Sequence, residues 1–258
     1  MIYFFSGTGN SMAVAAMLGK ELEEEARIVS SLHASSEELK GESVGFVFPV
    51  YSWGVPPIIL DFIKDLPEKF WLKVRNESVP VWCVMTCGDE VAMAPEMFIK
   101  ALKRRSITPQ TIRSVIMPND YVLLPGFDVD SREVEKDKLS KFPKRVAEIA
   151  ECIKRGESGI DVMRGSMPRL KTSLVYPLFK RWGIQPGKWH STEMCVGCGN
   201  CVMNCPLKNI AMNEHHRPEW GYNCSSCLGC YHSCPHHAVA YGNSTKGKGQ
   251  YFFPKIKD

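Results

Sequence analysis

The chain has 258 residues, of which 44% are hydrophobic and 23% are charged, a balance typical of a soluble globular protein and unlike a disordered, collagen-like or coiled-coil chain. Its formal net charge of +4 is a weaker imbalance than nucleic-acid-binding proteins usually show. It has no run near the ~20 apolar residues that cross a bilayer, and its first residues do not resemble a secretory signal. We therefore expect a cytoplasmic protein without membrane insertion, in which the eleven cysteines stay out of disulfides.

Residues 1 to about 155 alternate strand-like and helix-like segments. Apolar runs of strand length lie at Ile2–Phe5, Val44–Phe48, Val79–Met85 and Ile112–Met117, with a weaker candidate at Arg27–Ser31. Helical patterns lie at Met12–Glu24, Pro57–Asp65, Ala92–Arg105 and Ser131–Arg155. This alternation predicts an α/β fold, a doubly wound five-stranded parallel sheet with helices on both faces. Ligands of such sheets bind beyond the carboxyl ends of the strands, so the loops after the strands are the candidate site.

The first of these loops, within Phe4–Ser11, reads FFSGTGNS and joins the first strand to the first helix. A phosphate there would meet backbone N–H groups at a helix N-terminus, together with hydroxyl and amide donors. The P-loop motif is absent, and the dinucleotide fingerprint fails because Met12 stands at its third glycine position. The run resembles the flavodoxin phosphate loop T/S-x-T-G-N-T/S at every defined position. That resemblance implies an FMN phosphate site at Ser6, Gly7, Thr8, Gly9, Asn10 and Ser11.

The flavodoxin resemblance covers about residues 1–155 and implies two more loops around the flavin ring. These loops follow the third and fourth strands and contain Pro49, Val50, Tyr51, Ser52, Trp53 and Gly54, and then Thr86, Cys87, Gly88 and Asp89. Tyr51 and Trp53 offer flat faces for stacking, or else are half-buried surface aromatics. The loops do not reproduce the aromatic arrangement of short-chain flavodoxins, so the stacking geometry stays open.

Other residues near the expected ring are weaker candidates. We expect Cys87 to be a small packing residue rather than a redox thiol. The segment Pro118–Tyr121 is either a fourth loop beside the cofactor or a turn. Asp89, Asp120 and Tyr121 lie in suitable loops, but no acid/base pair stands out, so we name no catalytic residue.

A basic stretch separates this first domain, residues 1–156, from the remaining cysteines. Residues 157–192 are rich in glycine and proline, and between Val162 and Thr192 there are six Lys/Arg and no Asp/Glu. We expect an irregular connector with one short helix near Thr172–Arg181. Its charge indicates either a solvated linker or a surface that faces something negative.

Eight cysteines lie in a true internal repeat. Residues 195–212 and 224–241 each contain C-x2-C-x2-C-x3-C-P, with the second copy 29 residues after the first. This is the spacing of bacterial iron–sulfur sequences, in which three thiolates hold one cluster and the fourth ligates the other. The repeat therefore predicts two [4Fe–4S] clusters, the first held by Cys195, Cys198, Cys201 and Cys234 and the second by Cys224, Cys227, Cys230 and Cys205.

Structural zinc is the competing interpretation, because it also uses C-x2-C pairs. Zinc explains neither the third cysteine at the same spacing nor the Cys-Pro step in both copies. His232, His236 and His237 flank Cys234, but cysteine already supplies every ligand, so we expect exposed or hydrogen-bonded histidines. Residues 193–242 resemble bacterial two-cluster ferredoxins. The resemblance implies a small α+β domain, residues 193–258 with a C-terminal tail, that transfers electrons at low potential.

The whole chain resembles a family of flavodoxin–ferredoxin fusion proteins associated with anaerobes. The family's role implies an electron carrier that links FMN and the two clusters to redox partner proteins, whose identity and direction of electron flow the sequence does not give. The alternative is an FMN-dependent reductase of a small substrate fed by the clusters, which would need a proton donor and an open pocket. No NAD(P) motif is present, and the oligomeric state is not indicated. Only the basic connector supports a nucleic-acid-binding role.

Overall fold

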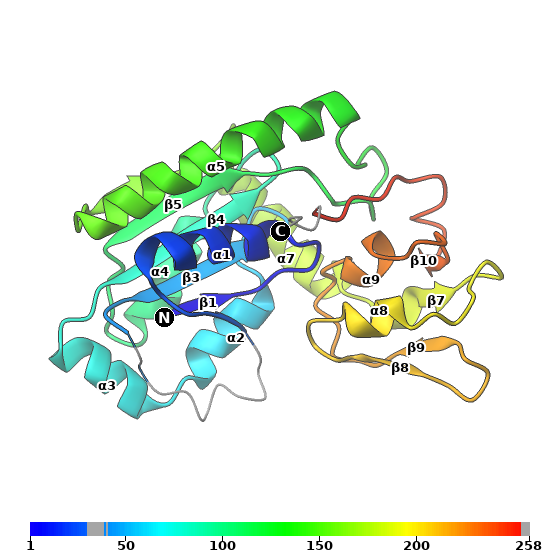
Figure 1. Cartoon of the computed structure of the whole chain (residues 1–258), viewed down its shortest axis with the longest axis horizontal. Coiled ribbons are helices and arrows are strands. Elements are labelled where there is room, and N and C mark those ends of the chain that lie inside the picture. Colours follow the sequence, from blue (N-terminus) through cyan, green and yellow to red (C-terminus); the bar gives the residue numbers. More distant parts are fainter. Residues whose placement is uncertain (30–38, 40, 254–258) are drawn as a thin grey trace.

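The computed structural model describes residues 1–29, 39 and 41–253, and in these residues it contains a six-stranded sheet beside a smaller cysteine-rich domain (Figure 1). All neighbouring strands of the sheet are parallel, in the order β2-β1-β3-β4-β5-β6. The strands are β1 (Ile2–Phe4), β2 (Ala26–Ile28), β3 (Val44–Pro49), β4 (Val81–Cys87), β5 (Thr111–Ile116) and β6 (Gly159–Asp161). The parallel α/β architecture is therefore confirmed, although the predicted count of five strands is one too few.

The additional strand, β6, is an edge strand paired only through its β5 side, and all three of its residues are exposed. With no buried face it carries no alternation of apolar and polar residues, which is why the sequence pattern did not predict it. Helix α3 (Glu68–Asn76) was also not predicted. The weak candidate Arg27–Ser31 corresponds to β2, and its last two residues lie outside the described part of the chain.

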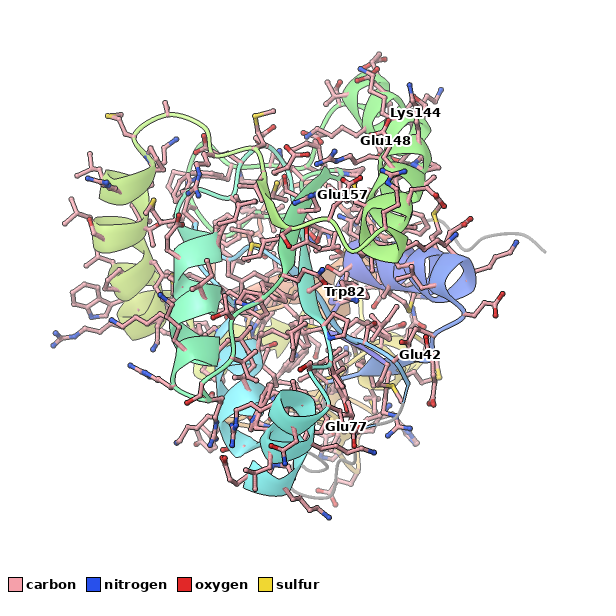
Figure 2. All side chains as sticks on the ribbon, turned by 90° about the vertical axis from the view of Figure 1, so that its left-hand side faces the viewer. Glu42, Glu77, Trp82, Lys144, Glu148 and Glu157 are labelled. Carbon is pink, nitrogen blue, oxygen red and sulfur yellow. The ribbon has the colours of Figure 1, made fainter. Side chains whose placement is uncertain are left out.

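Helices cover both faces of the sheet because consecutive strand residues point to opposite sides. Phe46 and Phe48 of β3 pack with α2 (Pro57–Asp65), α3 and α4 (Ala94–Lys103), whereas Val47 between them packs with α1 (Asn10–Leu22) and α5 (Arg132–Lys154). Trp82 is 1% exposed and lies near the centre of the molecule in Figure 2. The sheet is therefore a rigid, doubly covered support for the loops at its carboxyl edge.

The connector is more regular than the sequence indicated. A continuous helical run extends from Pro168 to Gly183, made of α6 (Pro168–Leu170), η2 (Lys171–Val175), α7 (Tyr176–Leu178) and η3 (Phe179–Gly183), where η2 and η3 are wider π turns. Proline is favoured at the first position of a helix and glycine at its end, which fits both boundaries. The short helix expected near Thr172–Arg181 is thus present and longer than predicted. We call Pro168–Gly183 the connector helix.

The cysteine-rich domain reflects the sequence repeat. Two short helices, α8 (Asn200–Met203) and α9 (Gly229–His232), occupy matching positions in the two copies of the motif. Antiparallel pairs flank them: β7 (Trp189–Ser191) with β10 (Val239–Tyr241), and β8 (Ile210–Met212) with β9 (Pro218–Trp220). In Figure 1 this domain lies beyond the end of the sheet at which the first loop leaves β1, so it faces the edge where ligands bind.

After β10 the chain returns to the sheet domain. Residues 249–253, which we call the C-terminal return, run back to the first loop, drawn in red in Figure 1. The Phe253 N–H donates to the Thr8 carbonyl at 2.7 Å, and the Phe253 ring meets Phe142 of α5 edge-on at 5.8 Å. The two domains are therefore joined by the connector and by this second crossing. Among the described residues, no helix combines the length and apolarity needed to cross a membrane.

Candidate functional site

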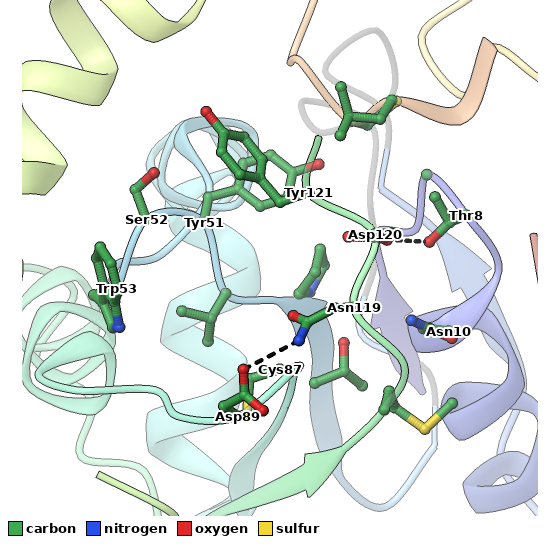
Figure 3. A pocket seen from close by; sticks show the side chains of 18 of the residues that line it. Thr8, Asn10, Tyr51, Ser52, Trp53, Cys87, Asp89, Asn119, Asp120 and Tyr121 are labelled. Carbon is green, nitrogen blue, oxygen red and sulfur yellow. Dashed lines mark hydrogen bonds between the residues drawn. The ribbon is translucent and has the colours of Figure 1, made fainter. Parts of the chain in front are cut away.

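A cavity of about 290 Å³ lies at the carboxyl edge of the sheet (Figure 3). It adjoins the switch point between β1 and β3, where the strand order reverses direction along the chain. The loops after β1, β3, β4 and β5 contribute to its walls. Of the residues predicted to bind flavin, all but Gly9 and Gly54 line it: Ser6, Gly7, Thr8, Asn10, Ser11, Pro49, Val50, Tyr51, Ser52, Trp53, Thr86, Cys87, Gly88 and Asp89.

The first loop is held in place by contacts from distant parts of the chain. Asn10 donates through Nδ2 to the Pro118 carbonyl at 3.0 Å and accepts through Oδ1 from the Tyr251 hydroxyl at 2.7 Å. The Ser11 hydroxyl lies 2.7 Å from that of Thr86 on β4. Gly9 has φ 98°, which favours glycine, and no described side chain caps α1. The first N–H groups of α1 therefore have no side-chain cap among the described residues, an arrangement that suits an anion.

Asp120 is a charged group in direct contact with the first loop. Its side chain accepts a hydrogen bond from the Thr8 hydroxyl (Figure 3), and its carbonyl accepts one from His232 Nε2 at 2.6 Å. Burial raises the pKa of the Asp120 carboxyl, while His232 and the Thr8 hydrogen bond act in the opposite direction. A carboxyl at this position would repel a bound phosphate when ionised and would tolerate it when protonated.

His232 connects the two domains through hydrogen bonds at both ring nitrogens. Its Nδ1 accepts from the Tyr251 N–H at 3.1 Å, and its Nε2 donates to the Asp120 carbonyl. A neutral imidazole satisfies both bonds, and burial lowers the His232 pKa accordingly. His236 and His237 are exposed. The histidines next to Cys234 are thus hydrogen-bonded or exposed, as expected.

The loop after β3, which was predicted to lie beside the flavin ring, is covered by the connector helix. Trp53 Nε1 donates to Glu90 Oε1 at 2.6 Å, and Lys171 both pairs with Glu90 and lies 5.4 Å from the Trp53 ring centre. The ring of Tyr51 meets Phe179 edge-on at 6.0 Å. Gly54 lies outside the cavity wall because Tyr176 packs directly against it, where an added Cβ would come within 2.3 Å. The connector therefore contributes part of the site.

Cys87 lies at the floor of the cavity and is 7% exposed. Burial raises the pKa of its thiol to about 12, so it stays protonated. This is the behaviour of a packing residue rather than of a thiolate.

Pro118–Tyr121 lines the cavity and is therefore a loop of the site. The sequence reasoning missed other wall residues, which come from the connector, the small domain and the segments after β4 and β5: Glu90, Leu124, Phe127, Lys171, Val175, Phe179, Ser226, Cys227 and Leu228.

The eight repeat cysteines surround two further small cavities. The first holds the predicted set Cys195, Cys198, Cys201 and Cys234, and the second holds Cys205, Cys224, Cys227 and Cys230. Among the described residues, no three or more His, Cys, Asp or Glu side chains lie close enough together to hold a single metal ion. Each set of thiols is instead arranged around a space, and in each set one cysteine comes from the other copy of the motif.

Several thiols already accept hydrogen bonds of the kind that tune iron–sulfur centres. The Asn209 and Ala238 N–H groups donate to Cys205 and Cys234, each at 3.3 Å and each four residues after its cysteine. Trp220 Nε1 donates to Cys230 at 3.4 Å. Burial raises the pKa of Cys227 to about 12, so the thiol ionises only when a metal centre holds the thiolate. The donor set and its surroundings therefore fit [4Fe–4S] chemistry.

The cavity at the sheet and the second cysteine cavity share a wall. Cys227 and Leu228 line both of them. The first loop and the small domain approach each other closely here because Gly7 has no side chain. A Cβ at Gly7 would lie 2.1 Å from the Cys227 carbonyl oxygen. A Cβ added at Gly229 would likewise lie 2.6 Å from the Gly7 carbonyl oxygen.

Comparison with known families identifies part of the small domain. The family described as 4Fe-4S binding domain (Fer4) matches residues 189–210, which include the whole first copy of the cysteine motif. No curated protein matches the chain. The molecule thus combines a parallel α/β sheet domain with a 4Fe-4S binding domain, and the match supports a role in iron–sulfur electron transfer.

Proposed function

We propose that this protein is an electron-transfer iron–sulfur flavoprotein, with FMN in the cavity at the sheet and a [4Fe–4S] cluster in each cysteine cavity. It comprises a flavodoxin-like domain (residues 1–156), a connector (157–192) and a two-cluster ferredoxin-like domain (193–258). The order β2-β1-β3-β4-β5 is that of flavodoxin, whose FMN lies at the β1/β3 switch point. The edge strand β6 adds to this order without interrupting it.

The observation that carries the proposal is the shared wall at Cys227. This residue is a predicted ligand of the second cluster and also lines the flavin cavity. The first cysteine cavity is linked in turn to the second, because Cys205 and Cys234 each cross from one copy of the motif to the other. When bound, the clusters supply single-electron steps and FMN supplies one- or two-electron steps. The chain itself holds the sites next to one another, in the order flavin cavity, second cysteine cavity and first cysteine cavity.

The connector helix and the small domain close part of the cavity, which favours an electron carrier over a reductase of a small substrate. Val175 and Phe179 of the connector helix and Ser226 of the small domain all line the cavity. A reductase would need an open ring face and a positioned proton donor. Asp120 lies at the Thr8 end of the cavity, where we place the phosphate, so it does not supply that donor.

Cofactor analysis tests the proposal directly. Protein purified without oxygen is expected to contain about eight iron and eight sulfide per chain and one FMN that heat releases. A reductant of the clusters should also reduce the flavin. Stoichiometric zinc without iron would contradict the cluster assignment, and iron-replete protein without flavin would contradict the FMN assignment.

The position of Asp120 predicts that FMN binding depends on pH. Because the carboxyl pKa is raised in the folded protein, the protonated form dominates at low pH, and repulsion of the phosphate appears as the pH rises through that pKa. FMN affinity should therefore fall with rising pH, and folded apoprotein should lose stability in the same direction. Asp120→Asn should remove this component and tighten FMN binding by at least about tenfold at pH values above the carboxyl pKa, where the wild-type side chain is charged.

Fluorescence titration of apoprotein across mildly acidic to mildly basic pH measures this effect. Riboflavin, which lacks the phosphate, is the control ligand and should bind with little change between wild type and Asp120→Asn. An identical pH profile for FMN in the two proteins would show that Asp120 does not face the phosphate.

A further inference from the structure

Side chains four residues apart lie on the same side of the connector helix. Its α-helical and π turns alternate along Pro168–Gly183, and their mixture averages about four residues per turn instead of 3.6. Residues four apart therefore stay on one side for the length of the helix. Lys171, Val175 and Phe179 all line the flavin cavity. Thr172 and Tyr176 form the adjoining side, and their hydroxyls donate to the Trp53 and Val55 carbonyls at 2.7 and 2.6 Å.

The side of the helix opposite Thr172 and Tyr176, which adjoins the cavity-lining side, is an exposed apolar row. It consists of Leu170, Leu174, Leu178 and Trp182, each between 50% and 57% exposed, and Met167 extends it at 64%. In Figure 2 the yellow-green connector helix stands at one edge of the molecule, with side chains pointing outward. We call these five residues the ridge. An exposed apolar strip of this length needs an explanation because isolated exposed hydrophobic residues, not rows of them, are normal on a soluble surface.

The charged residues of the connector helix are all positive. Arg169, Lys180 and Arg181 are exposed, and Arg181 lies 5.0 Å from the ring centre of Trp182. The segment from Val162 to Thr192 contains no Asp or Glu. A second copy of the ridge would bring like charges together, and a protein surface usually offers both signs at its rim. A helix with leucine and tryptophan on one side and only cations beside them matches the composition of interfacial amphipathic helices.

We propose that the ridge adsorbs to an anionic lipid surface, with Leu174, Leu178 and Trp182 entering the headgroup boundary and the flanking cations meeting lipid phosphates. The helix lies along the surface and does not span it, in keeping with the absence of a spanning helix among the described residues. Lys171, Val175 and Phe179, on the neighbouring side of the same helix, line the flavin cavity, so adsorption brings that cavity close to the lipid. This inference does not depend on the cofactor assignments, because ridge residues contact neither the cavity nor the cysteines.

Vesicle cosedimentation with the full-length holoprotein tests the proposal. Wild type should bind vesicles of phosphatidylcholine with phosphatidylglycerol, and bind pure phosphatidylcholine much less. Leu174→Glu with Leu178→Glu should weaken this binding more than about tenfold, because it puts charge on the apolar surface that would enter the lipid. Arg169→Gln, Lys180→Gln and Arg181→Gln together should weaken binding to the anionic vesicles by roughly a hundredfold. Leu72→Glu is the matched control, since Leu72 is 46% exposed on α3.

Each result decides the question. Loss of vesicle binding in the ridge variant but not in Leu72→Glu, with iron and flavin contents unchanged, supports the proposal. Failure of wild type to bind anionic vesicles overturns it, as does equal binding by the ridge variant. A wild-type dimer that the ridge variant makes monomeric, without vesicle binding, would instead assign the ridge to a second copy of the chain.

Discussion

Replacing Cys227 with alanine is expected to abolish the second cluster and stop electron transfer between the clusters and the flavin. The variant leaves Cys205, Cys224 and Cys230 as three thiols around a cavity built for four. Iron should fall from about eight to about four per chain, because the first set of cysteines is untouched. Iron analysis and the rate of flavin reduction after rapid mixing with a cluster reductant measure the two effects.

Cys152→Ala is the matched control for this experiment. Cys152 is a half-buried cysteine of α5 and lines neither cysteine cavity. Its replacement should leave iron, sulfide and flavin unchanged. If Cys227→Ala kept about eight iron and normal flavin reduction, the ligand assignment and the proposed route would both be wrong.

Gly7→Ala is expected to slow electron transfer while both kinds of cofactor stay bound. The new methyl group would lie 2.1 Å from the Cys227 carbonyl oxygen, so the loop and the small domain must move apart. A displacement of about 1 Å at a reacting site can cost about a hundredfold in rate, and we expect a loss of at least tenfold here. Stopped-flow measurement of flavin reduction, with iron and FMN assayed on the same samples, separates this effect from cofactor loss.

Gly187→Ala serves as the comparison. Nothing lies within 4 Å of a Cβ at that position, and its backbone is not in the left-handed region. It should reduce flavin as wild type does. Equal rates in Gly7→Ala and wild type would show that the shared wall is not on the path of the electrons.

Local patterns in the sequence were sufficient to predict most of the sheet. Strands such as β3 and β4 are buried on both faces, so they appear as apolar runs, and the rules for parallel sheets place the loops after them together. The edge strand β6 was missed because only pairing with β5 defines it. The connector helix was predicted too short because its four-residue repeat matches neither the α-helical nor the strand period.

Only those parts of the site that are formed by short segments directly after strands could be predicted. Three loops of the sheet could be anticipated from their positions after strands, and the fourth, Pro118–Tyr121, only as an alternative to a turn. The walls contributed by Phe179 and Cys227 could not, because they depend on how the connector and the small domain fold back onto the sheet. The same holds for Asp120, whose contacts with Thr8 and His232 join residues 112 positions apart in each case. Long-range packing leaves no periodic signal in a single sequence.

The C-terminal return has a consequence for biosynthesis. Tyr251 orients Asn10 across 241 positions of the chain, and Phe253 bonds to Thr8 beside it. During translation this loop leaves the ribosome well before Tyr251 and Phe253, so it acquires these partners only after residue 253 has followed. In the proposed flavoprotein, flavin loading would therefore be a late event in the life of each new molecule, and a chain stalled within the second cysteine motif would expose its sheet without a finished site at the first loop.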